Sequence, residues 1–139
     1  ELATKFGDVR ARGPLYDFDM TDYYAAEMGP GLSKTLAWFG PLVAPAQLAA
    51  RKQATISFER ARADDGRRTV NVDPGLLSAN SLVLATTKAS GHRICIATGL
   101  WAEVTLRFEK GAYRPQPWTY LDYQREDVGG FLLEVRAGL

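Results

Sequence analysis

The strongest constraint on the fold is a stretch of alternating residues that ends at Phe108. From Leu100 onward, apolar residues occupy positions 100, 102, 104, 106 and 108, and Trp, Glu, Thr and Arg occupy the positions between them. A period of two is that of a β-strand with one apolar face. Because Thr98 and Gly99 are typical turn residues, the sequence predicts a hairpin in which residues 94–96 pair with residues 100–108.

The most clearly bounded helix is predicted for residues 45–63. Pro45 suits the first helical position, and neither Pro nor Gly recurs before Gly66. A closing helix is expected at residues 126–136. Residues 78–88 fit either a helix capped by Ser78 or a strand, and we favour the helix.

Shorter elements complete the expected pattern. They are an extended segment at 15–20, a short helix at 21–28, a buried strand at 36–39, a strand at 69–72 and an irregular aromatic segment at 116–123. Hairpin strands with separate helices predict an α+β fold. We therefore expect one domain over residues 1–139, with a mainly antiparallel sheet and helices packed on one face.

Composition narrows the class of protein further. A net charge of +1 argues against general nucleic-acid binding. No run approaches the roughly 18 consecutive apolar residues that a membrane helix needs. Cys95 is the one cysteine of the chain and cannot form an internal disulfide, which favours a reducing, cytoplasmic compartment.

An acidic cluster near the N-terminus has two interpretations. Asp17 and Asp19 are two residues apart and share a face on a strand, and Asp22 follows in the next turn. Such carboxylates are ligands that Mg²⁺ prefers. Alternatively, Asp19 or Thr21 caps the short helix that follows, which is the more common role of acids at that place.

A second cluster is cationic. Lys88, His92 and Arg93 lie in one short segment beside a glycine, and a guanidinium can bind phosphate or carboxylate in a bidentate manner. The alternative is the polar flank of a hairpin. Glu103 lies between Trp101 and Thr105 on the less apolar strand face and is a candidate general acid or base. The alternative is that it lies on the solvent-facing side of the sheet.

Two further pairs complete the candidate residues. At 100° per residue, Lys52 and Glu59 fall in the same helical row as Leu48, so they need charged partners or a ligand if that row is buried. The open alternative is a solvated face. Trp118 and Tyr120 are candidates for stacking on a ring of a ligand, or they cover the core.

The chain resembles a bacterial family of unestablished function, domain of unknown function 4416 (DUF4416), from about Pro14 to Arg136. The motifs that carry the resemblance are Tyr16-Asp17-Phe18-Asp19-Met20-Thr21-Asp22-Tyr23-Tyr24, Glu27-Met28-Gly29-Pro30-Gly31-Leu32, Asn71-Val72-Asp73-Pro74-Gly75, Leu82-Val83-Leu84-Ala85-Thr86-Thr87-Lys88, His92-Arg93-Ile94, Ala102-Glu103-Val104-Thr105-Leu106 and Pro117-Trp118-Thr119-Tyr120. The resemblance implies a small cytoplasmic protein and supplies no catalytic residues. A GTP-binding label that some members carry is not supported here, because Ser33 precedes Lys34 where a phosphate loop needs glycine.

Comparison with the family pattern shows positions where this sequence differs, and it implies that further elements precede Glu1. Ile56 stands where the family usually has Asn, and Ala97-Thr98 stands where Gly-Asp is usual. The segment Glu1–Phe6 reads as the last turn of a helix stopped by Gly7. We therefore expect a strand and most of a helix to precede Glu1, and an open sheet edge that recruits a second copy or a partner chain.

The sequence leads to two hypotheses about function. The first is binding of a small anionic ligand such as a nucleotide or phosphate ester, with or without turnover, and with Mg²⁺ as the candidate cofactor. The second is a non-catalytic interaction or oligomerisation module. They are distinguished by whether the acidic, cationic and aromatic residues converge on one place.

Overall fold

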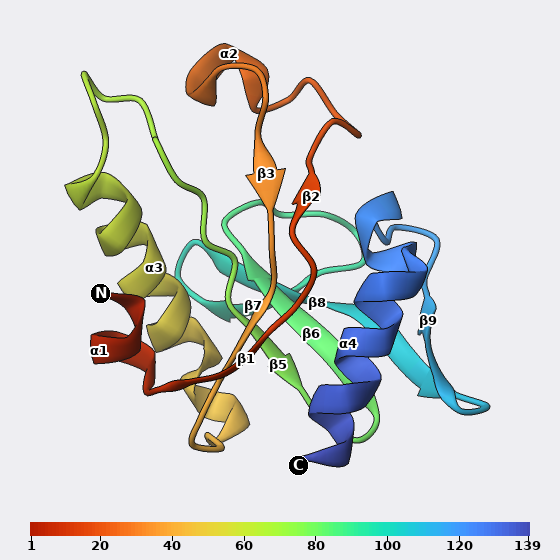
Figure 1. Ribbon diagram of the computed structural model, residues 1–139. Coiled ribbons are helices and arrows are strands. Elements are labelled where there is room, and N and C mark those ends of the chain that lie inside the picture. Colours follow the sequence, from red (N-terminus) through yellow and green to blue (C-terminus); the bar gives the residue numbers. More distant parts are fainter.

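The centre of the structure, a computed structural model of residues 1–139, is an antiparallel sheet (Figure 1). Its strands are β5 (Gly75–Leu77), β6 (Ser81–Thr86), β8 (Leu100–Glu109) and β7 (Ile94–Ala97), hydrogen-bonded in that order. A fifth strand, β9 (Ala112–Pro115), pairs with the far half of β8. The predicted hairpin of residues 94–96 with 100–108 is therefore confirmed.

A β-bulge divides β8 into two halves. Leu82 of β6 pairs with Leu106, but the next residue, Val83, pairs with Val104, so Thr105 has no partner of its own. The extra residue reverses which side chains face which side of the sheet. As a result Thr105 is buried and Val104 is 38% exposed, which corrects the unbroken alternation expected from the sequence.

The two long helices pack against β6 through different residues. Helix α3 (Leu48–Ala61), preceded by a 3-10 turn at Pro45–Gln47, packs with Leu48 against Ala85. Helix α4 (Glu126–Ala137) packs against Leu82. Because Leu82 and Ala85 are three residues apart on one strand, they point to opposite faces. The α+β class is confirmed, and α3 and α4 cover opposite faces of β6 where helices on one face were expected.

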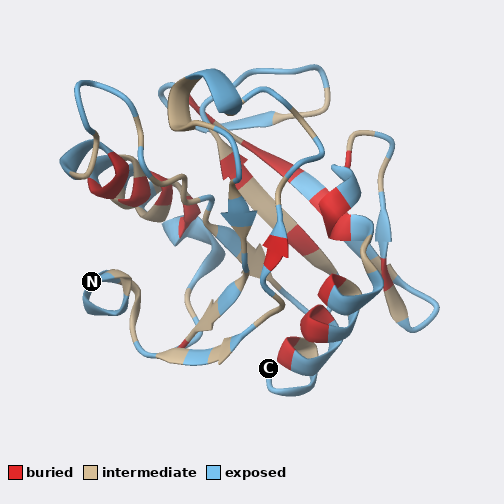
Figure 2. Cartoon of the chain, turned by 45° about the horizontal axis from the view of Figure 1, so that its top comes forward, coloured by how far each residue is buried: buried red, intermediate tan, exposed pale blue.

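The larger part of the core lies between α4 and the sheet. Figure 2 shows buried residues along the inner side of α4 and in the strands behind it. This cluster consists of Tyr16, Leu82, Leu106, Tyr113, Tyr123, Val128, Phe131, Leu132 and Val135. It includes Tyr123 from a 3-10 turn, Leu121–Gln124, within the segment expected to be irregular and aromatic.

The N-terminal third forms two ribbons outside the sheet. One pairs β1 (Val9–Arg12) with β4 (Ala37–Phe39), and the other pairs β2 (Tyr16–Asp17) with β3 (Ser33–Lys34). A single helical turn, α2 (Ala25–Met28), joins β2 to β3 at the top of the view in Figure 1. We call residues 16–34 the arm.

Helix α1 (Leu2–Phe6) ends at Gly7, whose φ of +93° suits glycine, as the sequence indicated. It lies beside α3, since the Arg51 guanidinium is 5.6 Å from the centre of the Phe6 ring. None of the helices is long and apolar enough to cross a bilayer.

Several short elements differ from expectation. Residues 78–88 contain strand β6, so the helix that we favoured for them is wrong. Local propensity allows either a helix or a strand there, and pairing with β8 stabilises the strand. Residues 69–72 form no strand, and the amide of Val72 instead donates a hydrogen bond to the Glu59 side chain. Strand β4 is only partly buried because its ribbon lies at the periphery. The predicted helix 21–28 is one turn long, whereas the predicted helices 45–63 and 126–136 are confirmed.

Candidate functional site

Glu103 is the centre of a buried polar cluster on β8. One of its carboxylate oxygens, Oε2, lies 2.6 Å from Nε2 of His92 and accepts a hydrogen bond from Nε of Arg93 at 2.9 Å. Glu103 is only 8% exposed, so the guanidinium supplies the compensating charge that a buried carboxylate requires. It is therefore not an acid isolated among aromatic rings.

The imidazole of His92 is held on three sides. Its ring stacks on the indole of Trp118, and its second nitrogen, Nδ1, lies 3.2 Å from Oγ of Ser90. Trp118 is fixed in turn because its Nε1 donates a hydrogen bond to the carbonyl of Val104 at 2.9 Å. Glu103 completes the enclosure at Nε2.

The side chain of Arg93 stabilises the loop between β6 and β7. Nη1 of Arg93 donates to the carbonyl of Lys88 at 2.8 Å, while Nε of the same side chain binds Glu103. The ammonium of Lys88 lies 3.6 Å from the centre of the Tyr23 ring, which belongs to the arm. The loop therefore connects the sheet to the arm.

Five of the predicted site residues thus converge: Lys88, His92, Arg93, Glu103 and Trp118. Tyr120, also predicted, is 61% exposed and makes no side-chain hydrogen bond. It lies near Tyr24, whose pKa rises to about 12 through burial, then the charge of Asp73, then Tyr120.

Lys52 and Glu59 on α3 are buried, as the helical row indicated, and the chain itself provides their partners. Nζ of Lys52 lies 2.9 Å from Oδ1 of Asp73, and Oε1 of Glu59 accepts a hydrogen bond from the Val72 amide at 2.6 Å. These contacts hold the loop before β5 against α3. They explain the two residues structurally, without a ligand.

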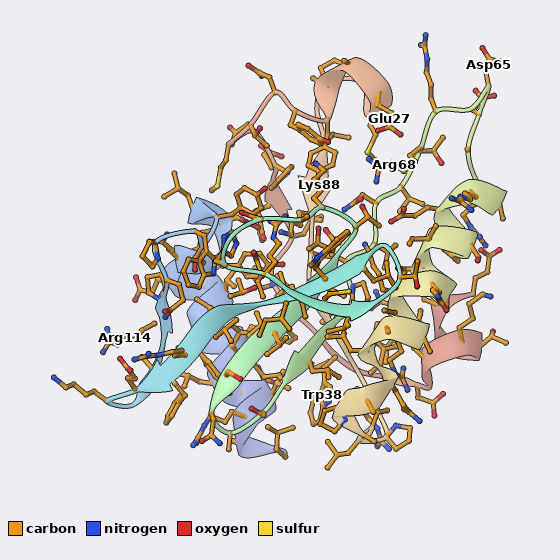
Figure 3. The ribbon with its side chains drawn as sticks, turned by 180° about the vertical axis from the view of Figure 1, so that it is seen from behind. Glu27, Trp38, Asp65, Arg68, Lys88 and Arg114 are labelled. Carbon is orange, nitrogen blue, oxygen red and sulfur yellow. The ribbon has the colours of Figure 1, made fainter.

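A bidentate ion pair joins the same loop to the arm. Arg68 donates to both carboxylate oxygens of Glu27, from Nε at 2.8 Å and from Nη2 at 2.9 Å. Figure 3 shows the two side chains facing each other. These hydrogen bonds lower the pKa of Glu27 to about 2.

Sequence analysis missed a third network, around Asp122. This residue is fully buried, and its Oδ2 accepts hydrogen bonds from the Tyr16 hydroxyl at 2.9 Å and from Nζ of Lys34 at 2.5 Å. Its other oxygen has no partner. Burial, followed by the charge of Asp122, raises the pKa of Tyr16. The sequence feature that could have indicated this network is the acidic residue within the aromatic segment 116–123.

Tyr123 lies where the three networks meet. Burial raises its pKa well above 10, and the charges of Asp122, Asp73 and Glu103 act in the same direction. Nζ of Lys34 lies 4.3 Å from the centre of its ring. The arm, the loop before β5, the β6–β7 loop and the segment before α4 thus bring their charged residues to one end of the sheet.

The three aspartates predicted to bind a metal are not brought together. Asp17, Asp19 and Asp22 are exposed, and no group of three or more His, Cys, Asp or Glu side chains in the structure could hold a metal ion. Their side chains do not cap α2 either. The hydroxyl of Thr21 accepts a hydrogen bond from the Tyr23 amide and so supports the turn before the helix.

A separate groove of about 350 Å³ runs between α3 and the β7–β8 turn. Ile56 and Thr98, at two of the positions where the sequence departs from the family pattern, both line it. Neither belongs to the cluster around Glu103. Those departures therefore leave that cluster intact.

Comparison with known proteins agrees with the resemblance found in the sequence. The model of the family described as domain of unknown function (DUF4416) matches residues 1–138. No curated protein and no solved structure shows significant similarity. The chain belongs to the DUF4416 family.

Proposed function

We propose that this chain binds a small anionic ligand, such as a nucleotide or phosphate ester, at the β6–β7 loop. The observation that carries the proposal is that the ammonium group of Lys88 has no acidic partner. Its ammonium lies over the ring of Tyr23 and has no carboxylate within ion-pair distance. Lys34, Lys52 and Arg68, the cations of the neighbouring networks, each pair with an acid.

The surroundings of Lys88 support an anion rather than a cation. Its loop carries two fixed positive charges, Lys88 and Arg93, against the single negative charge of Glu103, a local balance of +1 before His92 is counted. The amides of Gly91 and His92 form no hydrogen bond within the protein. Ammonium, guanidinium and free amides are the donors that phosphate oxygens accept.

Aromatic side chains add a second element of recognition. Tyr23 and Tyr120 are 59% and 61% exposed, and both lie near Tyr24. Exposed aromatic faces near a cationic loop favour a ligand that carries a ring as well as an anionic group, because bases stack on such faces. A nucleotide combines both.

The proposal is tested by calorimetric titration with inorganic phosphate and with adenosine monophosphate. Replacing Lys88 by Met should weaken binding of both about tenfold or more, since a charge-assisted hydrogen bond contributes ~1.5–3 kcal/mol. Lys5→Met is the matched control, because Lys5 is exposed on α1, away from the loop. Equal affinities of the wild type and the Lys88 variant would contradict the proposal.

A second candidate is an interaction module, favoured by the edge strand β7. It pairs only with β8, carries no charged residue, and exposes Ile94 by 74% and Ile96 by 36%. Natural edges are commonly protected by charge or proline, and an unprotected one recruits other chains. The free thiol of Cys95 on the same strand supports a cytoplasmic location.

A further inference from the structure

Ser90, His92 and Glu103 form a continuous hydrogen-bonded series. Oγ of Ser90 lies 3.2 Å from Nδ1 of His92, and Nε2 of the same ring lies 2.6 Å from the Glu103 carboxylate. A hydroxyl, an imidazole and an acid in that order are the parts of a nucleophilic hydrolase site. We propose that Ser90 is a catalytic nucleophile and that the chain hydrolyses carboxylic esters that carry an anionic group.

The direction of the hydrogen bonds supports this role. An ionised carboxylate only accepts, so Glu103, which also accepts a hydrogen bond from Arg93, holds the proton of His92 on Nε2. The lone pair of the ring is then on Nδ1, which faces Ser90. Many triads use the two nitrogens the other way round, but the nitrogen that acts as base is set by the hydrogen bond at the other one.

The imidazole is held in position for this task. It stacks on Trp118 with the ring planes inclined by 14°. Ser90 is exposed, so its hydroxyl is accessible to a substrate from solvent. A fixed base beside an accessible hydroxyl is the arrangement that general base catalysis requires.

Donors for an oxyanion lie next to the nucleophile. The amides of Gly91 and His92, the two residues that follow Ser90, form no hydrogen bond within the protein. A methyl group built on Gly91 would meet no atom within 4 Å, so the backbone there is open to a ligand. Backbone amides after the nucleophile are common members of oxyanion holes.

The proposed reaction has two steps. Oγ of Ser90 attacks the ester carbonyl carbon while its proton passes to Nδ1 of His92, and the alcohol leaves with that proton as the acyl-serine forms. Water then gives a proton to Nδ1 and attacks the acyl-serine, which releases the carboxylic acid and returns the proton to Oγ. The net change is ester plus water to acid plus alcohol, with no oxidation and no cofactor. The preference for anionic esters rests on the anion site proposed above, near Lys88.

The experiment is covalent labelling with a small uncharged fluorophosphonate, mapped by peptide mass spectrometry. We expect one label on Ser90 of the wild type and none on Ser90→Ala. His92→Ala and Glu103→Gln should be labelled at least tenfold more slowly, because a positioned base contributes about 10²–10⁴ in rate. Ser33→Ala is the control, since Ser33 is exposed on β3 and makes no side-chain hydrogen bond.

Any of three outcomes would contradict the assignment of Ser90 as nucleophile. They are no label on the folded wild type, unchanged labelling of Ser90→Ala, or an unchanged labelling rate in His92→Ala. Hydrolysis of 4-nitrophenyl acetate and of the 4-nitrophenyl ester of succinate, which carries a free carboxylate, separates this proposal from the anion site. Lys88→Met should remove the preference for the succinate ester. If labelling fails while phosphate still binds, the nucleophile alone is wrong; if labelling holds without any preference for the succinate ester, the anion site is wrong.

Discussion

The imidazole of His92 lies flat on the indole of Trp118, with ring centroids 4.5 Å apart. Both rings depend on adjoining residues of β8. Glu103 binds the imidazole, and the carbonyl of Val104 binds the indole. The β-bulge at Thr105 follows these two residues directly on the strand.

Replacing Trp118 should loosen His92 in two separable steps. Trp118→Phe keeps an aromatic face but loses the indole hydrogen bond, and we expect a loss of about 1 kcal/mol in the free energy of unfolding. Trp118→Ala loses both and should cost about 2 kcal/mol. Urea denaturation measures these costs; equal losses in the two variants would show that the stacking contributes nothing.

The same variants have a direct spectroscopic test. His92 is the only histidine of the chain, so its ring protons give one set of imidazole signals. Stacking on an indole shifts such signals upfield. Trp118→Ala should return them to the positions of a free imidazole, while Trp118→Phe should leave part of the shift.

Lys34 and Asp122 should prove strongly coupled. Lys34→Met leaves a fully buried carboxylate with only the Tyr16 hydroxyl as donor, and breaking a buried pair in this way typically costs ~3–5 kcal/mol. Since the side chain of Lys34 is 27% exposed, we expect the lower end of that range. Asp122→Asn removes the charge that Lys34 compensates and keeps an oxygen for Tyr16.

The double variant Lys34→Met with Asp122→Asn provides the control for this pair. Its loss of unfolding free energy should be smaller than the sum of the single losses by at least about 1 kcal/mol, because the second change removes the unpaired charge left by the first. Denaturation of all four proteins under one condition measures the difference. Additive losses would mean that the ion pair does not hold the arm to the body.

The cationic residues of the β6–β7 loop and the acidic residue of β8 could be predicted because they are close in sequence. Lys88, His92, Arg93 and Glu103 all lie on or beside one hairpin, so the strand prediction was enough to bring them together. Asp122 could not be assigned in this way. Its partners Tyr16 and Lys34 lie 106 and 88 residues away, and nothing in local periodicity specifies that pairing.

The errors in secondary structure have the same cause. Residues 81–86 have the local character of a helix or a strand, and the backbone pairing with β8 decides between them. Residues 69–72 alternate like a strand, but Glu59 and Arg68 bind this loop through side chains instead of a neighbouring strand. In both places a long-range contact overrides the local pattern.

Acid should weaken the contact between arm and body through Glu27. Arg68 lowers the folded-state pKa of this carboxyl to about 2, below its ordinary value near 4.5. The stabilisation is therefore fully present above pH 4.5 and is lost as the pH falls from 4.5 toward 2. Because the side chain is 35% exposed, solvent screening leaves roughly 1 kcal/mol of the effect.

Glu27→Gln isolates that contribution. Between pH 5.5 and pH 3 the free energy of unfolding should fall more for the wild type than for the variant, because an amide does not titrate. Other acids, such as Asp127, whose pKa Arg125 also lowers, contribute equally to both proteins and cancel in the comparison. Identical acid sensitivity in the two proteins would show that Arg68 does not hold Glu27 ionised.

The edge strand β7 supplies the last prediction. Two copies that pair antiparallel through β7 would place Ile94 of one chain near the isoleucines of the other, and no charged residue lies within the strand to oppose this. Light scattering coupled to size exclusion should then show a dimer that Ile94→Lys converts to monomer, because a charge on an edge disfavours strand addition. Ala89→Lys, on the exposed loop before β7, adds the same charge away from the edge and should leave the dimer intact. A wild type that remains monomeric at millimolar concentration would exclude self-association through β7 and leave the anion-binding loop as the better account of the fold's exposed features.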